Sequence, residues 1–313
     1  MRHPFAFDPT YGYGLPDLLA IQPPPEPEGF AAFWRARYQR ALAVDPAPQI
    51  VASSLRRRGF AVFDLCYRST GDFAIRGWLL VPESRPARRG LVFGHGYGGL
   101  ARPDLDTPCA DAVYLVPCFR GLGASRCAAL PSDPARHVVH GIAKPEDYLI
   151  GACVDDLWIG VTALLQLHPE LSGALGYMGV SFGGGIGALA LAWDRRLSRG
   201  HLEVPTFGHQ RLRLRLPTLG SAVGVQNHAA RHPEVADILD YFDAAIAARH
   251  IRQQMHIAAA LFDPAVAPPG QFAIYNALPA KARLFVLQAG HFDYPARETQ
   301  HRELMAELAD FFA

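Results

Sequence analysis

The stretch Tyr177-Met178-Gly179-Val180-Ser181-Phe182-Gly183-Gly184-Gly185 decides how this chain is expected to fold. Glycines stand two residues before and two residues after Ser181. An apolar run precedes the stretch at 174–178 and a run of small residues follows it at 186–193, which predicts a strand, a sharp turn and a helix. Such a turn presents a serine hydroxyl at the sheet edge, and the next helix points its free N–H groups at any oxyanion formed there. We therefore predict that Ser181 is a nucleophile.

Residues 171–193 carry no charged side chain. A stretch of that length could span a membrane, which takes about 20 apolar residues. Seven glycines lie within it, however, and a strand, a turn and a buried helix account for it without lipid. We expect no membrane partner.

Composition favours one large folded unit. Half of the 313 residues are hydrophobic and the formal net charge is +1. We interpret 1–313 as a single domain, with an N-terminal extension and helix over 1–45 and an insertion or cap over 196–253. No basic stripe is present, so we expect no nucleic-acid partner. Residues 1–8 lack the apolar segment of a secretory signal and the five cysteines form no C-x-x-C pair, which favours a reduced, cytoplasmic protein.

Strand-like and helical patterns alternate along the chain, which predicts an α/β fold with a mostly parallel sheet flanked by helices. Helices are predicted over 30–42, 150–165 and 304–312. An antiparallel hairpin is predicted over 59–67 and 73–81, and further strands over 91–93, 112–116, 256–261 and 282–287.

Residues 194–253 are the least regular part of the chain. Arginine alternates with leucine over 211–216, a period that fits a strand with one solvated face. Residues 238–251 have a helical pattern, and we expect them to lie near the site as part of the cap.

A serine nucleophile needs a base, and the base needs an orienting acid. In the α/β-hydrolase order both follow the serine, on loops after later strands. Asp263 follows the strand that ends near Phe262, and His291 follows the strand 284–287. Both therefore stand beyond the carboxyl ends of predicted strands, where open α/β sheets place their ligands. We expect Ser181, Asp263 and His291 to form the catalytic triad.

Four other residues are weaker candidates for these roles. Asp240 and Asp243 fall inside a helical pattern, where solvated carboxylates are usual. His301 lies in the last helix and His256 precedes a strand. A lone histidine is more often structural than catalytic, whereas the position after the last strand favours His291.

The oxyanion would be held by two backbone N–H groups. One is the amide of Phe182, next to the nucleophile, and the other comes from the loop Gly94-His95-Gly96-Tyr97-Gly98-Gly99, where we expect the Tyr97 amide. We expect no metal and no cofactor.

An ordered set of motifs runs nearly end to end and resembles carbohydrate esterase family seven, the acetyl xylan esterases and cephalosporin C deacetylases. The segments that carry the resemblance are FAAFW (30–34), IRGW (75–78), HGYGG (95–99), FRGLGAS (119–125), GI and PEDY (141–142 and 145–148), LDYFD (239–243) and DPAVAPPGQFAIYN (263–276).

This resemblance implies an α/β-hydrolase fold, the same triad and release of acetate from small esters. It also implies closed homo-oligomers and no metal. It places Arg120 and Phe182 at the substrate-binding site. The chain departs from the family pattern at Phe182 and Leu122, which replace glutamines, and at 149–150. Residues 197–210 look like an insertion.

These departures make the predicted site more apolar and keep other functions open. One is a lipase-like or polyester-type hydrolase for apolar esters, which would use the same triad. A dipeptidase or amidase is less favoured, because no acidic pair for a free amine is apparent. The last is a non-catalytic binding protein on the same fold, although all three triad residues are present.

Overall fold

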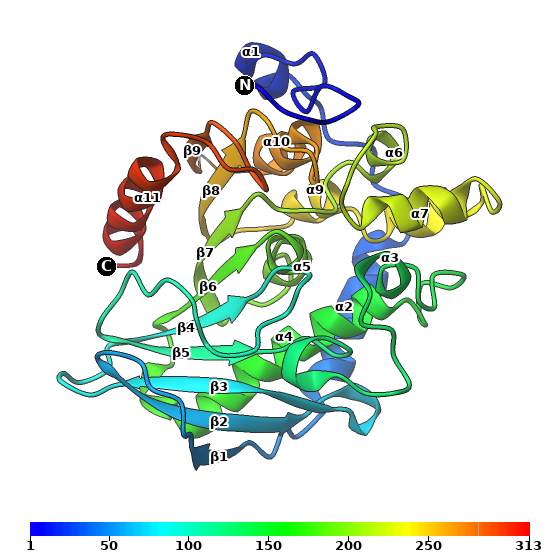
Figure 1. Cartoon of the computed structure of the whole chain (residues 1–313). Coiled ribbons are helices and arrows are strands. Elements are labelled where there is room, and N and C mark those ends of the chain that lie inside the picture. Colours follow the sequence, from blue (N-terminus) through cyan, green and yellow to red (C-terminus); the bar gives the residue numbers. More distant parts are fainter. Residues whose placement is uncertain (281) are drawn as a thin grey trace.

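The structure is a computed structural model that describes residues 1–280 and 282–313. Its centre is a nine-stranded sheet in the order β1-β2-β3-β5-β4-β6-β7-β8-β9 (Figure 1). The strands are β1 (Gln49–Ala52), β2 (Phe60–Arg68), β3 (Ala74–Pro82), β4 (Arg89–Gly94), β5 (Ala112–Pro117), β6 (Leu175–Val180), β7 (Leu197–Glu203), β8 (Gln254–Ala260) and β9 (Arg283–Leu287). The first four in that order pair antiparallel, and every pair from β5 to β9 is parallel.

Helices cover both faces of this sheet. The helices are α1 (Leu15–Leu19), α2 (Phe30–Leu42), α3 (Pro134–His137), α4 (Leu149–Leu167), α5 (Phe182–Leu191), α6 (Gln210–Arg213), α7 (Ala222–Ala229), α8 (Val235–Asp240), α9 (Ala244–Ala248), α10 (Pro268–Ala277) and α11 (Arg297–Phe312), with short 3-10 turns η1 (Thr70–Asp72), η2 (Gly123–Ser125) and η3 (Pro169–Leu171). The larger core cluster joins one face to α2, α4, α5, α9 and α10, and the smaller joins the other face to α11. This is the α/β-hydrolase arrangement that the sequence predicts.

Helix α4 is long and apolar enough to cross a membrane by length and composition. In the structure 78% of its most apolar 18-residue segment is buried inside the protein. Its residues pack into the larger core, so the helix is accounted for as the central helix of one sheet face.

The prediction of an insertion at 197–210 is wrong for residues 197–203. Residues 197–203 form β7, which pairs in parallel with β6 on one side and β8 on the other. A strand inside a parallel sheet is covered on both faces, so its buried and exposed residues alternate only weakly. The sequence of β7 therefore shows no clear two-residue period. The irregular cap therefore begins after Glu203 rather than at residue 196.

The Arg-Leu alternation at 211–216 does not make a strand. Residues 210–213 form α6, because the Asp243 carboxylate accepts the amides of His209 (3.0 Å) and Gln210 (2.6 Å) at the start of that turn. The same carboxylate caps α9 through the amides of Ala245 and Ile246. Asp243 thus divides the predicted helix 238–251 into α8 and α9, and it is a buried cap rather than a solvated side chain.

Candidate active site

The turn between β6 and α5 holds Ser181 in an unusual backbone conformation. Its φ of 54° and ψ of −109° lie outside the regions that most residues adopt. The turn is fixed by hydrogen bonds from the Ser181 amide to the Glu203 carbonyl (2.8 Å) and from the Thr206 amide to the Ser181 carbonyl (3.1 Å). Such strain is typical of functional positions, and here it places the serine hydroxyl beyond the end of the strand.

Glycine is required where α5 crosses β4. A Cβ on Gly183 would lie 2.1 Å from the carbonyl oxygen of Gly94. The absence of side chains lets the Gly183 amide donate to the His95 carbonyl (3.0 Å). This contact brings the start of α5 against the loop after β4, from which the second oxyanion donor was predicted.

The structure brings Ser181, His291 and Asp263 together in one hydrogen-bonded chain. His291 Nε2 lies 2.9 Å from Ser181 Oγ, and His291 Nδ1 lies 2.8 Å from Asp263 Oδ2. The three side chains come from the turn after β6, the loop after β9 and the loop after β8. They meet at the carboxyl edge of the parallel strands, as their order in the sequence predicts.

Asp263 is fully buried and all its acceptor capacity is used. Its Oδ1 accepts the amides of Ala265 (2.8 Å) and Val266 (2.9 Å), and its Oδ2 also accepts Gln271 Nε2 (3.0 Å). These donors therefore hold the carboxylate in a fixed orientation toward His291. The role of Gln271 was missed by the sequence analysis. Its place inside the segment 263–276, eight residues after the acid, was the available signal.

The electrostatic surroundings favour a basic imidazole at His291. Burial acts to lower its pKa, but the charge and hydrogen bond of Asp263 outweigh burial and raise the pKa above its usual value. The Glu203 carboxylate adds to this effect. A raised pKa is what a general base needs to remove a hydroxyl proton.

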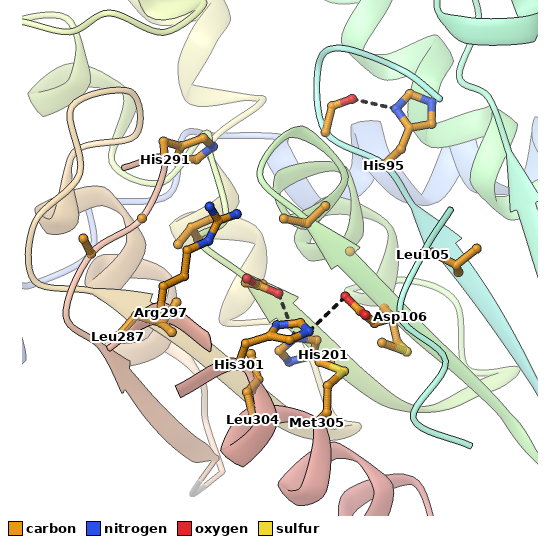
Figure 2. A pocket seen from close by; sticks show the side chains of 18 of the residues that line it. His95, Leu105, Asp106, His201, Leu287, His291, Arg297, His301, Leu304 and Met305 are labelled. Atoms are coloured by element: carbon orange, nitrogen blue, oxygen red, sulfur yellow. Dashed lines mark hydrogen bonds and ion pairs between the residues drawn. The ribbon is translucent and has the colours of Figure 1, made fainter. Parts of the chain in front are cut away.

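Two backbone amides are available beside Ser181. Within the described chain, neither the Phe182 amide nor the Tyr97 amide has a hydrogen-bond partner. The loop that carries Tyr97 is held by His95, whose Nδ1 lies 2.7 Å from the Gly96 carbonyl (Figure 2) and whose Nε2 accepts the Phe119 amide at 3.1 Å. Burial lowers the pKa of His95 to about 4, so the ring is neutral and can donate at one nitrogen and accept at the other.

The side chain of Phe182 does not line the site, contrary to the sequence-based expectation. It is fully buried and lies between the rings of Tyr97 (centroids 4.1 Å apart) and Phe119 (5.4 Å apart). Leu122 is also buried. Both replacements of a family glutamine therefore fill the core beneath the turn. Only the backbone amide of Phe182 is therefore expected to take part in the reaction at Ser181.

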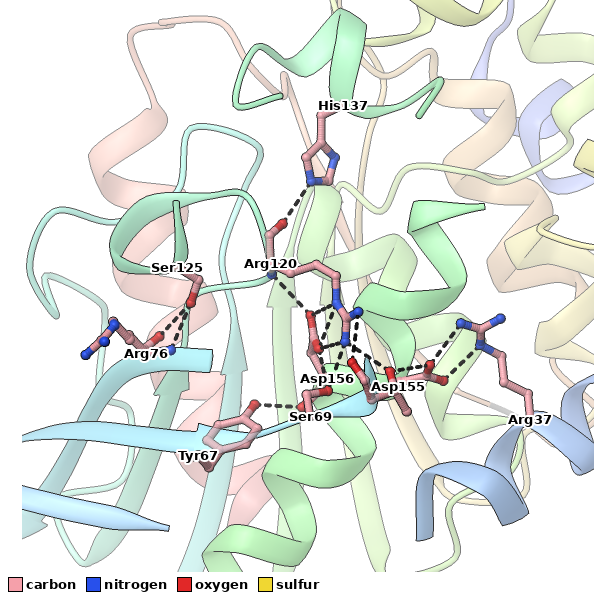
Figure 3. Close-up of polar contacts among 10 residues, drawn as sticks. Arg37, Tyr67, Ser69, Arg76, Arg120, Ser125, His137, Asp155 and Asp156 are labelled. Carbon is pink, nitrogen blue, oxygen red and sulfur yellow. Dashed lines mark hydrogen bonds and ion pairs between the residues drawn. The ribbon is translucent and has the colours of Figure 1, made fainter. Parts of the chain in front are cut away.

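The side chain of Arg120 does not line the site either. Arg120 is 8% exposed, and its Nε lies 3.0 Å from Asp156 Oδ2 on α4 (Figure 3). The Arg120 carbonyl lies 3.0 Å from His137 Nε2, and His137 Nδ1 lies 3.2 Å from the Tyr97 hydroxyl. Arg120 therefore supports the floor of the site from within the core, because a buried carboxylate needs a paired cation.

A cavity of about 580 Å³, called the front cavity below, opens in front of the triad. Its walls include Ser181, Tyr97, His291 and the turn 219–221 that precedes α7. The cap thus contributes to the site through that turn, whereas the helices α8 and α9 do not line the cavity. The four weaker candidates lie elsewhere: Asp240 pairs with Arg211, Asp243 caps α9, His256 is buried on β8 and His301 pairs with Asp106.

No group of three or more His, Cys, Asp or Glu side chains is arranged to hold a metal ion within residues 1–280 and 282–313.

Comparisons with known proteins identify the family and agree with the fold. The model of the acetyl xylan esterase family matches residues 22–305. The fold is similar to that of an acetyl xylan esterase from Paenibacillus sp. R4, with a TM-score of 0.82, 21% identity, and 94% of this chain and 99% of that chain covered. The fold is also similar to that of acetyl xylan esterase 1 from Thermoanaerobacterium sp. JW/SL YS485, with a TM-score of 0.77 and 20% identity. That match covers 96% of this chain and 99% of the other.

A more distant likeness shows how widely this fold is used. An acylaminoacyl peptidase from Pyrococcus horikoshii matches with a TM-score of 0.65 and 14% identity, over 82% of this chain and 41% of that chain. At such identity the likeness shows the fold alone. The family match, in contrast, spans most of the sequence, and this chain belongs to the acetyl xylan esterase family of carboxylic ester hydrolases.

Proposed function

We propose that this protein is a serine esterase that hydrolyses small acyl esters, above all acetyl esters, through Ser181, His291 and Asp263. The observation that carries the proposal is the hydrogen-bonded chain of these three side chains at the mouth of the front cavity. The two unpartnered amides of Tyr97 and Phe182 beside Ser181 support it, because an ester carbonyl gains negative charge during attack.

The proposed reaction has two halves. Ser181 Oγ attacks the carbonyl carbon while His291 Nε2 takes the hydroxyl proton, and the resulting oxyanion accepts hydrogen bonds from the Tyr97 and Phe182 amides. The intermediate then expels the alcohol, which receives the proton from His291, and an acyl-serine remains. Water next gives a proton to His291 and attacks the acyl group. The bond from the acyl carbon to Ser181 Oγ then breaks, Oγ takes the proton back from His291, and the carboxylic acid leaves.

Asp263 stabilises the imidazolium that forms in each half. It binds His291 Nδ1 at 2.8 Å and is itself held by two amides and Gln271, so the ring cannot turn away from Ser181. The carboxylate does not take the proton in this scheme.

The acetyl preference is supported by the family and by the names of the related structures, both acetyl xylan esterases. The alternative prediction, a hydrolase for apolar esters, was based on Phe182, Leu122, the departure at 149–150 and the expected insertion at 197–210. The side chains at 182, 122 and 149–150 are buried in the core and residues 197–203 form β7, so these departures no longer favour it.

The test is a rate series with p-nitrophenyl esters from acetate to octanoate, together with a fluorophosphonate probe. We expect the acetate to have the highest kcat/KM and the probe to modify Ser181, as mapped by peptide mass spectrometry. An octanoate preference would support the rival esterase. Probe-treated protein without a Ser181 adduct would instead support a non-catalytic binding protein.

Assembly and location are parts of the same proposal. A homo-oligomer is supported by the family resemblance and by the edge strand β1, where Ile50 and Val51 are exposed. Sedimentation equilibrium tests it: a mass equal to one 34.2 kDa chain would contradict it. A cytoplasmic location is supported by the five cysteines, all free thiols.

A further inference from the structure

The segment 3–11 lies across the loops that carry two of the three triad residues. It precedes α1, and Figure 1 shows the start of the chain in dark blue beside α10. The segment forms no helix or strand, but its burial alternates: residues 3, 5, 7 and 9 are buried or half-buried, and residues 4, 6 and 8 are exposed. Such alternation is that of an extended chain with one face against the protein. We call residues 3–11 the strap.

The inner face of the strap packs on two phenylalanines that are sequence neighbours of the triad. Phe262 immediately precedes Asp263 in the chain. Phe292 immediately follows His291, and its ring centroid lies 5.1 Å from that of Phe262. The ring of Phe5 lies against both, 6.4 Å from Phe262 and 5.5 Å from Phe292. Phe5 therefore completes a cluster of three rings that joins the loop of the acid to the loop of the base.

Hydrogen bonds attach the strap to the catalytic acid and to the cap. The Asp263 amide donates to the Pro9 carbonyl at 3.1 Å. The Tyr11 hydroxyl donates to the Pro217 carbonyl at 2.7 Å and lies 3.5 Å from the Asp263 carbonyl. Pro217 leads into the turn 219–221, which lines the front cavity. The strap thus holds the acid on one side and the wall of the site on the other.

His291 needs such support because its own backbone is strained. Its φ of 47° lies in the left-handed region, which is unfavourable for a residue with a side chain. Phe262 holds the residues on both sides of it, since its carbonyl accepts the Gly290 amide at 2.8 Å and its ring contacts Phe292. A strained conformation persists only where its surroundings over-determine it. The ring of Phe5 is part of those surroundings.

The strap also has a fixed shape of its own. The Asp8 carboxylate accepts the amide (2.9 Å) and the hydroxyl (2.6 Å) of Thr10. The Tyr11 amide donates to the Asp8 carbonyl at 2.9 Å, which closes a turn. This turn sets the direction of the Pro9 carbonyl and of the Tyr11 side chain, the two groups that bind outside the strap.

Building on the proposed esterase function, we infer that the strap positions the base and the acid of the triad and that Phe5 is its main positioning residue. Phe5 does not line the front cavity, so it acts on His291 through Phe262 and Phe292. A displacement of about 1 Å in a catalytic group can cost about 10²-fold in rate. A contact remote from the substrate can therefore control kcat.

The test is Phe5→Ala, assayed with p-nitrophenyl acetate. His291 is expected to be held less firmly toward Ser181, so that kcat falls by about 10-fold. KM is expected to stay within about twofold of the wild type, since no residue of the strap lines the front cavity. A wild-type kcat in this variant would overturn the inference. A raised KM with unchanged kcat would overturn it in favour of a role in binding.

Two further variants separate positioning from stability. Phe5→Leu keeps an apolar side chain on the two rings and is expected to restore kcat to within about threefold of the wild type. Phe63→Ala is the matched control, because Phe63 is a half-buried phenylalanine on β2, near the opposite edge of the sheet from β8 and β9. It is expected to keep the wild-type kcat. Equal falls of kcat in Phe5→Ala and Phe63→Ala would overturn the positioning role.

Hydrogen exchange separates this inference from the proposed function, because it needs no substrate. The Asp263 amide, bound to the Pro9 carbonyl, is expected to exchange about 10-fold faster in Phe5→Ala than in the wild type, and at the wild-type rate in Phe63→Ala. If the wild type does not hydrolyse p-nitrophenyl acetate, the esterase proposal fails, while exchange at Asp263 still decides whether the strap fixes the acid. Equal exchange in the wild type and Phe5→Ala would overturn the role of the strap.

Discussion

At the scale of single residues, the nucleophile and its partners could be predicted because their roles depend on chain order. Ser181 stands between a strand and a helix, and Asp263 and His291 each follow a later strand. Parallel strands bring these positions to one edge whatever the details of packing. Side-chain direction is different, since it depends on neighbours distant in sequence. Phe182 and Arg120 were expected in the pocket, and both turn into the core.

The Asp263–His291 contact sets how activity depends on pH. His291 must be neutral to act as a base, so activity falls as the pH drops through its pKa, which Asp263 raises. In Asp263→Asn that pKa is expected to fall. The acidic limb of the kcat/KM profile with p-nitrophenyl acetate should therefore move to lower pH, and kcat should drop by about 10⁴-fold, as in other serine triads. An unmoved limb would show that another group titrates.

Arg120 is expected to matter for stability rather than for substrate. Arg120→Met leaves Asp156, which is fully buried, without its cation, at a cost of about 3–5 kcal/mol in the free energy of unfolding. KM for p-nitrophenyl acetate should stay unchanged. Urea denaturation and steady-state kinetics measure the two effects, and Arg211→Met, which removes an exposed ion pair, is the control with a loss below about 1 kcal/mol. A raised KM with unchanged stability would show that Arg120 contributes to substrate binding and would contradict this prediction.

At the scale of elements, the sequence identified those with a strong period or an apolar run. These include α2, α4, the β2–β3 hairpin, β6 and α11. It failed where tertiary partners decide the conformation. β7 looked like part of an insertion because both of its faces are covered, and α6 exists because a distant carboxylate caps its first amides. The edge strand β1 is short and all four of its residues are exposed, so no alternation marked it in the sequence.

The crossing of α5 and β4 gives a prediction at this scale. Gly183→Ala would force a Cβ to within 2.1 Å of the Gly94 carbonyl oxygen, so the helix must move away from the strand. The protein is expected to lose about 3 kcal/mol or more of stability, at the upper end for single changes. Gly98→Ala is the matched control, since a Cβ there meets nothing within 4 Å. Thermal unfolding of both variants checks this, and equal Tm values would refute the packing argument.

At the scale of the whole molecule, one sheet collects every group of the proposed mechanism at its carboxyl edge. The fold class and this edge could be predicted from the alternation of strands and helices. The cavity in front of the triad could not, because it depends on where the cap comes to lie. Only the position of the catalytic residues, and not the shape of the space around them, is contained in chain order.

The number of free thiols in the purified protein tests the proposed cytoplasmic location. Cys66, Cys109, Cys118, Cys127 and Cys153 are all free. We expect five equivalents of thiol to react with a chromogenic disulfide after unfolding without reductant, and about one, the exposed Cys127, to react rapidly in the folded protein. A total of three or fewer from freshly purified protein would point to a disulfide and against a reducing compartment.

The hydrolysis of p-nitrophenyl acetate by Ser181→Ala tests the central claim most directly. The change removes one hydroxyl and leaves the charges of His291 and Asp263 in place, so the protein should fold as the wild type does. Without the nucleophile, kcat/KM is expected to fall by at least about 10⁴-fold, to the level that binding and the oxyanion amides provide alone. A Ser181→Ala protein that hydrolyses the ester at the wild-type rate would contradict the account.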